Sequence, residues 1–148
     1  MSQENVEIVR RLFGVYLEAL DSGDLNIWFD QDDLADDFEW VMPAGGGLGF
    51  PSTYRGREEF HEFMQTWTQE QFQDWSIELE RLIDAGGDRV VAFFHQRAIG
   101  RASGIPVELH MGTLYELEDG RVVRMRHFID REEALEAAGQ ARKVITTQ

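Results

Sequence analysis

The chain contains no cysteine, and its basic residues are few. The absence of cysteine excludes disulfide bonds, a thiol nucleophile and any thiolate-ligated metal site. Only 14 lysines and arginines stand against 28 aspartates and glutamates, which gives a formal net charge of -14. Because an acidic surface repels phosphate backbones and anionic lipids, we expect neither a nucleic acid nor a membrane surface as a partner.

Long apolar runs are also missing from the sequence. No segment approaches the length that spans a membrane. The opening residues lack the basic and then apolar pattern of an export signal, since they read MSQENVEIVRR. A cytoplasmic location is the resulting expectation.

The composition is that of a globular protein, with 43% hydrophobic and 11% aromatic residues. A length of 148 residues fits one domain with a substantial core, and no internal repeat or linker divides it. We therefore expect a single domain over residues 1–148, with a flexible tail at 140–148.

Apolar residues recur with a helical period in three segments of the first half. They predict helices at 3–21, 24–35 and 57–72. Gly23 follows the first of these, where a glycine commonly ends a helix. The stripe in the third segment is more typical of a core-facing helix than of a cofactor site.

From residue 74 onward the period changes to two, which indicates strands. The predicted strands in this half are 75–83, 89–100, 107–118 and 121–129, followed by a closing helix at 132–138. One further short strand is predicted earlier, at 38–42. Helices followed by an antiparallel meander define an α+β fold. A strongly curved antiparallel or mixed sheet that wraps around the helices forms a cone with an internal pocket for a small molecule.

A glycine cluster lies at 43–51, in PAGGGLGFP. Such a cluster binds phosphate when a strand precedes it and a helix opens directly after it. Here Pro51 and a further loop intervene, so we interpret the segment as a mobile lip, with phosphate binding as the alternative. The acidic residues at 30–37 lack the spacing of a calcium-binding loop and are interpreted as solvated surface.

The last predicted strand carries the main candidate for chemistry. Arg124 and Arg126 share one face of this strand, and arginine is rarely fully buried. Met125, His127 and Ile129 therefore face the interior. An imidazole titrates near neutral pH, which suits a general acid or base. The alternative is a hydrogen-bonded histidine that only lines a pocket.

A second histidine lies on the strand at 89–100. If Val91 and Phe93 face inward, the period of two places His95 and Arg97 inward as well. His95 and His127 would then act as a base and a proton shuttle, or the two would hold a substrate carboxylate with Arg97. A metal site needs a third ligand that the sequence does not identify, so we predict no metal. The alternative is that Arg97 extends to the rim and His95 bonds to a neighbour.

The sequence resembles the SnoaL-like branch of the nuclear transport factor 2-like superfamily. The resemblance covers essentially the whole chain and rests on ENVEIVRRLF, YLEALDSGDL, DDFEW, YRGREEF, IDAGGDRVV and DGRVVRMRHFIDREEALEAAG. It implies the conical α+β fold. It says little about function, because this fold carries isomerases, cyclases, hydrolases, dehydratases and binding proteins.

Two positions gain a role from this resemblance. Tyr16 is similar to the tyrosine of ketosteroid isomerases that donates a hydrogen bond to an oxyanion; otherwise it is a core tyrosine. His127 falls where SnoaL-type cyclases and limonene epoxide hydrolases carry an aspartate. Met42 falls near the ketosteroid isomerase base and Thr113 near its second donor, so isomerization by the usual residues is not expected.

We expect a flat, apolar or aromatic ligand, and no cofactor. Besides the candidate catalytic residues His127, Tyr16 and His95, the predicted pocket walls comprise Trp40, Met42, Phe60, Met64, Trp67, Phe93, Arg97, Thr113, Tyr115, Met125 and Ile129. His110 shares the parity of Glu108 and Glu116 and is placed on the outer face of the sheet.

Large apolar residues on the outer face predict a homodimer through that face: Phe94, Leu114 and Phe128. Three functions remain open at this point. The first is a cofactor-free isomerase, cyclase or hydrolase that uses His127 and Tyr16. The second is a non-catalytic protein that binds a small ligand, and the third is a dimeric interaction module.

Overall fold

Six strands form one open, mixed sheet in the computed structural model, which describes residues 2–43 and 53–139. The strand order is β2-β1-β6-β5-β4-β3; β1 is parallel to β6, and the other neighbouring pairs are antiparallel. The α+β class is therefore confirmed. The elements are α1 (Ser2–Ser22), α2 (Asn26–Phe29), β1 (Leu34–Val41), β2 (Thr53–Arg55), α3 (Gly56–Gln65), the π-helix η1 (Thr66–Gln71), β3 (Phe72–Asp84), β4 (Arg89–Gly100), β5 (Pro106–Glu118), β6 (Arg121–Phe128) and α4 (Arg131–Ala137).

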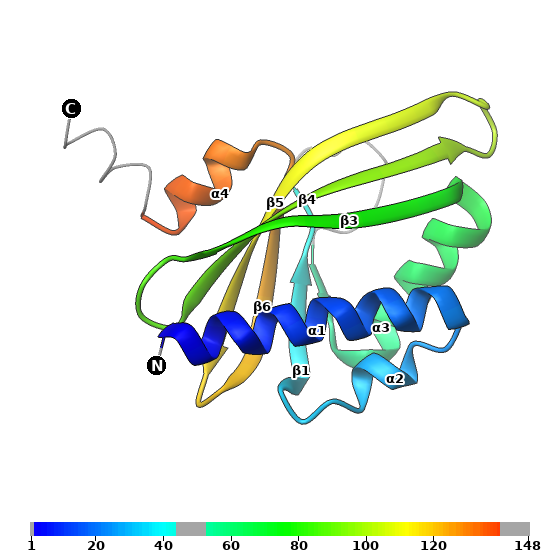
Figure 1. Cartoon of the computed structure of the whole chain (residues 1–148). Helices are drawn as coiled ribbons and strands as arrows, with labels where there is room; N and C mark the ends of the chain where they lie inside the picture. The colour runs from blue at the N-terminus through cyan, green and yellow to red at the C-terminus, as the bar shows by residue number, and fades with distance from the viewer. Residues whose placement is uncertain (1, 44–52, 140–148) are drawn as a thin grey trace.

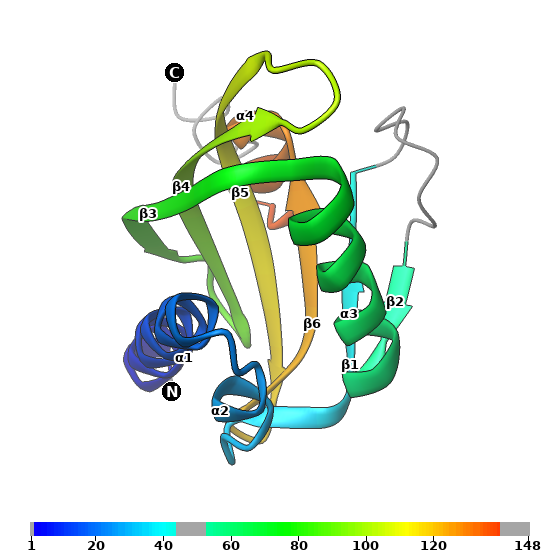
Figure 2. The same ribbon diagram turned by 90° about the vertical axis from the view of Figure 1, so that its right-hand side faces the viewer.

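The long strands β3, β4 and β5 curve over α1 and α3, as Figures 1 and 2 show. These helices fill the concave side, where the main core lies. Helix α4 packs on the opposite face of the sheet, mainly against β5 and also against β6 and β4. Among the described residues, no helix is long and apolar enough to cross a membrane.

Two local features near the end of the chain position its last strand. Asp119 and Gly120 join β5 to β6 with φ angles of 51° and 77°, the left-handed conformation that a tight two-residue hairpin needs. Asp130 caps α4, since its carboxylate accepts a hydrogen bond from the Glu132 backbone N–H at 2.9 Å. The hairpin and the cap bracket the strand that carries His127.

The predicted helix at 24–35 is wrong beyond its first turn. Helix α2 ends at Phe29, and β1 already begins at Leu34. Leu34 pairs with Val122 of β6, and the Val122 N–H donates to the Asp33 carbonyl at 2.7 Å. Sheet pairing prevails because a helix this short is marginal by itself.

The predicted third helix also ends early. Helix α3 stops at Gln65, η1 continues to Gln71, and β3 starts at Phe72. The Phe72 ring lies 4.6 Å from the Trp67 ring, so the apolar stripe continues in space although the backbone has become a strand. The short strand β2 was not predicted. Most of the predicted lip at 43–51 and the tail at 140–148 lie outside the described residues.

The outer face of the sheet differs from the predicted dimer surface. Phe94 belongs to the main core, and Leu114 is fully buried beneath α4, where it clusters with Ala134. Phe128 packs against the same cluster. The outer face of β2, β1, β6 and β5 instead carries a row of ion-paired side chains, Arg55, Glu39, Arg124, Glu116 and Arg126. The homodimer stays a prediction, without the apolar residues that motivated it.

Gly112 lies where α4 packs on β5, and this contact leads to a testable prediction. A Cβ atom at Gly112 would lie 2.8 Å from the Ala134 Cβ atom and 3.6 Å from the Arg131 Cα atom. We expect Gly112→Ala to lower the free energy of unfolding by about 1–3 kcal/mol through overpacking, as measured by urea denaturation.

Gly14 provides the matched control for this substitution. It lies within α1, and an added Cβ atom would meet nothing within 4 Å. We expect Gly14→Ala to raise the free energy of unfolding by roughly 0.5–1 kcal/mol, since alanine favours a helix more than glycine does. The same change in both variants would contradict close packing of α4 on β5.

Candidate functional site

A cavity of about 50 Å³ lies between the helices and the concave face of the sheet. All four tryptophans of the chain line it, as do all the methionines except Met1: Trp28, Trp40, Trp67 and Trp75, with Met42, Met64, Met111 and Met125. No charged side chain occurs among the described residues of its wall. The site is therefore an apolar and aromatic chamber with a few uncharged polar groups.

Most of the predicted wall residues do line this cavity: Trp40, Met42, Met64, Trp67, Thr113, Tyr115 and Met125, together with Tyr16 and His127. Phe60 lies in the core behind them, with its ring centroid 4.6 Å from that of Trp40. Ile129 is 49% exposed, so its predicted inward position is wrong. Strand β6 ends at Phe128, and the period of two no longer applies beyond it.

Three other predicted residues lie on the outer face of β4: Phe93, His95 and Arg97. The inward residues of this strand are Phe94 and Gln96, both of which line the cavity. The sequence prediction failed because β4 is apolar on both faces between Val90 and Phe94. Alternate residues there pack against the main core or under α4. Local periodicity does not distinguish two buried faces.

A signal in the sequence would have given the correct phase of β4. Arg89 and Arg97 share one parity, and the rule that places the arginines of β6 outside applies equally to them. The sequence analysis also missed Trp75 and Met111, which line the cavity from β3 and β5.

His127 is buried in the cavity wall, with 7% of its surface exposed. Its ring packs on the Trp40 indole at a centroid distance of 4.1 Å. Thr113 lies directly opposite on β5, and its Oγ1 atom is 2.7 Å from the histidine Nδ1 atom. The Nε2 atom has no hydrogen-bond partner among the described residues. This nitrogen is therefore free to bond to a ligand.

The protonation state of His127 follows from its burial. Removal from water lowers the pKa of His127 from 6.5 to about 3, so the imidazole is neutral at neutral pH. If the Thr113 hydroxyl donates to Nδ1, the Nε2 atom carries the proton and is a donor. If Nδ1–H donates instead, Nε2 is an acceptor. Rotation of one hydroxyl group allows either role.

The donors of three cavity residues are bonded to methionine sulfurs. The Tyr16 hydroxyl donates to Met64 Sδ at 3.8 Å. The other two pairs are Trp40 Nε1 with Met42 Sδ at 3.2 Å, and Gln96 Nε2 with Met111 Sδ at 3.0 Å. A thioether is a weak acceptor. Burial also raises the pKa of the Tyr16 phenol, which keeps its proton. An oxygen atom of a ligand would therefore accept a stronger hydrogen bond from each of these donors than the methionine sulfur does.

The chain belongs to the SnoaL-like domain family, whose pattern matches residues 14–125. Among curated protein sequences none matches it. Solved structures share the fold. A nuclear transport factor 2-like protein of unknown function from Burkholderia pseudomallei is 23% identical, with a TM-score of 0.69 over 90% of this chain and 95% of that chain.

Two further solved structures are similar to this chain. TerC, co-crystallised with polyporic acid, is 22% identical with a TM-score of 0.69, over 92% of this chain and 98% of that chain. A candidate SnoaL-like polyketide cyclase from Jannaschia sp. is 26% identical with a TM-score of 0.67, over 94% of this chain and 93% of that chain. The predicted membership of the SnoaL-like branch is thereby confirmed.

The burial of a neutral His127 predicts a stability that depends on pH. Below about pH 6.5 the unfolded chain gains a proton at this imidazole, whereas the folded chain does not until about pH 3. Because the unfolded state binds more protons in this window, the free energy of unfolding falls as the pH is lowered through it. The fall due to His127 approaches roughly 1.4 kcal/mol per pH unit and vanishes above the window.

Urea denaturation between about pH 4 and pH 7 measures this effect. His127→Asn is the comparison, since asparagine does not titrate and its amide takes the place of Nδ1 opposite Thr113. We expect the variant to lose less stability than the wild type as the pH is lowered. Parallel curves for the two proteins would show that the folded state protonates His127 as readily as the unfolded chain does.

Proposed function

We propose that this chain binds a small, uncharged, mainly aromatic molecule in the cavity, through contacts that include hydrogen bonds to ligand oxygens. One observation carries the proposal: an aromatic wall without charge, in which donors are bonded to thioether sulfurs. Aromatic side chains contribute large apolar contact areas. A charged ligand would lose its hydration and find no described counter-ion on the wall.

The size of the cavity bears on how a ligand enters. At about 50 Å³ it is smaller than the roughly 150 Å³ of a cavity known to hold benzene in another protein. Its four methionines have unbranched side chains with three rotatable bonds, which adapt readily to new shapes. Rotation of Met42, Met64 or Met111 would enlarge the cavity and release a donor in the same movement. Ligand binding and opening of the cavity are therefore coupled in this proposal.

The similar structures support a ligand-binding role without naming the ligand. TerC was crystallised with polyporic acid, and a protein of ketosteroid isomerase-like fold from Catenulispora acidiphila, 15% identical, with trimethylamine. A small molecule in the present cavity would agree with these examples.

An enzyme is the second candidate, a cofactor-free isomerase, cyclase or hydrolase. The Nε2 atom of His127 favours it, since a reactive nitrogen is left without a described partner. With a pKa of about 3, however, His127 is a weak base at neutral pH, and no described carboxylate of the wall raises that value. Catalysis would use the neutral imidazole and Tyr16 as hydrogen-bond donors to a carbonyl oxygen.

A thermal-shift comparison tests the binding proposal. The probes are 2-naphthol and 1-tetralone, with 2-naphthoate as the charged match. A ligand that binds only the folded chain raises the melting temperature. We expect the two neutral probes to raise it and the carboxylate to have little effect. An equal shift with 2-naphthoate, or none with any probe, would contradict the proposal.

Substitutions in the wall assign the contacts. We expect Tyr16→Phe and His127→Asn each to weaken 1-tetralone binding roughly threefold to tenfold, the value of one neutral hydrogen bond. Naphthalene, which has no oxygen, serves as the control ligand and should bind the variants and the wild type alike. A matching loss of naphthalene binding would mean that the substitutions altered the cavity shape instead.

The variant His127→Asn also distinguishes a binding protein from an enzyme. If the chain converts a carbonyl compound, His127→Asn should abolish turnover, measured by product formation, while that compound still binds. Retained turnover in His127→Asn would remove this residue from the chemistry.

A further inference from the structure

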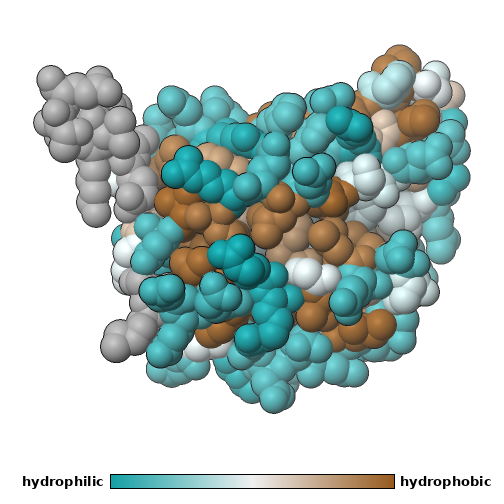
Figure 3. Space-filling model, viewed as in Figure 1, coloured by the Kyte–Doolittle hydropathy of each residue, from teal (hydrophilic) through white to brown (hydrophobic). Residues whose placement is uncertain are grey.

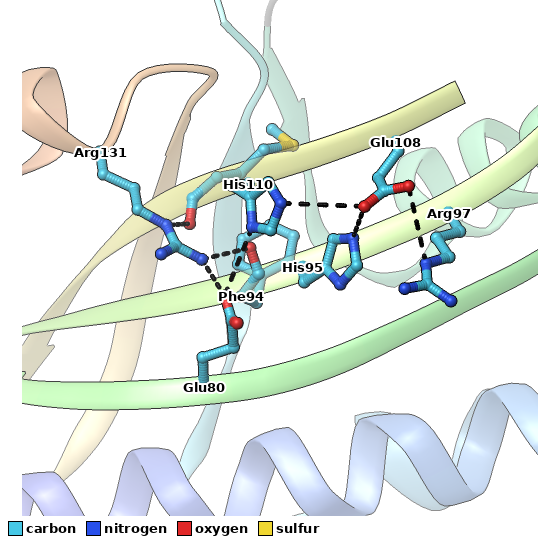
Figure 4. A network of polar contacts seen from close by, with 8 residues as sticks. Glu80, Phe94, His95, Arg97, Glu108, His110 and Arg131 are labelled. Atoms are coloured by element: carbon cyan, nitrogen blue, oxygen red, sulfur yellow. Dashed lines mark hydrogen bonds and ion pairs between the residues drawn. The ribbon is translucent and has the colours of Figure 1, made fainter. Parts of the chain in front are cut away.

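Two histidines and a glutamate meet on β4 and β5 (Figure 4). They lie on the outer face of the sheet, since the alternate residues Phe94 and Gln96 line the cavity. His95 and His110 form a cross-strand pair, and Glu108 lies two residues before His110 on the same face. One carboxylate oxygen, Glu108 Oε1, lies 2.9 Å from His95 Nε2 and 3.9 Å from His110 Nε2. A ligand atom from each of the three lies within 4.8 Å of the others.

Charged side chains support these three residues from outside. The other nitrogen of His110, Nδ1, lies 3.7 Å from Glu80 Oε1, and Glu80 forms an ion pair with Arg131. The second oxygen of Glu108 lies 3.9 Å from Arg97 Nε. Metal-binding histidines commonly donate their other N–H to a carboxylate, which fixes the ring and raises the basicity of the ligating nitrogen. At 3.7 Å, the contact between His110 Nδ1 and Glu80 is longer than a hydrogen bond, and a small rotation of either side chain would give that arrangement.

We propose that His95, His110 and Glu108 form a site for a divalent zinc ion. Two imidazole nitrogens and one carboxylate oxygen are ligands that zinc takes when it keeps a position for water. Zinc–ligand distances of about 2.0–2.1 Å put tetrahedral ligand atoms roughly 3.3 Å apart. The His110 Nε2 atom, at 3.9 Å from Glu108 Oε1, must therefore rotate inward. His110 and Glu108 are more than half exposed, which leaves them free to move and the site open to ions from solution.

A hydrogen-bonded cluster without a metal is the competing explanation. The two rings stack in parallel, with centroids 4.3 Å apart and planes 2° apart, as neutral imidazoles can. The Glu108 carboxylate can accept an N–H from each ring, but only His95 Nε2 is within hydrogen-bonding distance of it, at 2.9 Å, whereas His110 Nε2 lies 3.9 Å away. A cation would bind lone pairs of both rings and of the carboxylate together, and a zinc titration distinguishes the two explanations.

Such an ion would join β4 to β5 next to the cavity wall. Phe94 and Gln96, the neighbours of His95, face the cavity on the other side of the sheet. Zinc would hold the two strands in register at this level and stabilise the folded chain by binding to it alone. The site does not depend on the proposed ligand-binding function.

Calorimetric titration of zinc chloride into untagged, chelator-treated protein tests the proposal. We expect saturable binding of one ion per chain and a higher melting temperature with zinc. His110→Ala and Glu108→Gln should each weaken binding by at least tenfold. Glu80→Gln should weaken it about tenfold as well, the usual effect of losing a partner behind a metal ligand.

His61→Ala is the matched control, because it removes an exposed histidine on α3 that is not part of the cluster. This variant should bind zinc like the wild type. A cobalt titration adds a spectroscopic readout, since ligand-field bands that appear in the wild type should be lost in His110→Ala. No saturable binding, or the same affinity in His110→Ala as in the wild type, would overturn the proposal and leave a hydrogen-bonded cluster.

Discussion

The pairing of β5 with β6 is the constraint on which the cavity depends. It sets Thr113 opposite His127, so that a hydroxyl group meets the imidazole deep in an apolar wall. It also sets Tyr115 opposite Met125, the next inward pair along the strands. A shift of one residue in either strand would turn these side chains to the outer face. The tight turn at Asp119 and Gly120 starts the pairing, and an irregularity between Glu116 and Leu117 shifts the register by one residue before it reaches Thr113. The turn and this irregularity together determine the chemistry of the chamber.

The cavity contains polar groups without strong partners, and this has an energetic consequence. Buried donors normally reach oxygen acceptors, because an unsatisfied donor costs about 1–3 kcal/mol. Here Tyr16, Trp40 and Gln96 bond to sulfur instead. In the folded chain these donors have only weak acceptors, so they can form stronger hydrogen bonds to the oxygen atoms of a ligand. A wall built from methionine and aromatic side chains combines this availability with an adaptable shape.

One sheet carries two chemically opposite surfaces on the same strands. In β4, residues with the parity of Phe94 build the aromatic chamber, while those with the parity of His95 build a charged outer network. These surfaces are the two faces of a single sheet. Helix α4 covers part of the outer face and leaves the His110 and Glu108 side chains more than half exposed, whereas that of His95 is 11% exposed. Figure 3 shows hydrophilic and hydrophobic residues side by side on one face of the molecule. The period of two along a strand is sufficient to produce both.

The sequence by itself determined the α+β class, the first helix, the four long C-terminal strands and the inward position of His127. These features follow from periodicities that persist over many residues and from turn residues with specific backbone requirements. Only the tertiary structure decided the early end of α2 and which layer covers each face of β4. Both faces of β4 are apolar near Val91, because one meets the main core and the other meets α4. Local periodicity records that a face is buried, but which layer buries it depends on elements far away in the sequence.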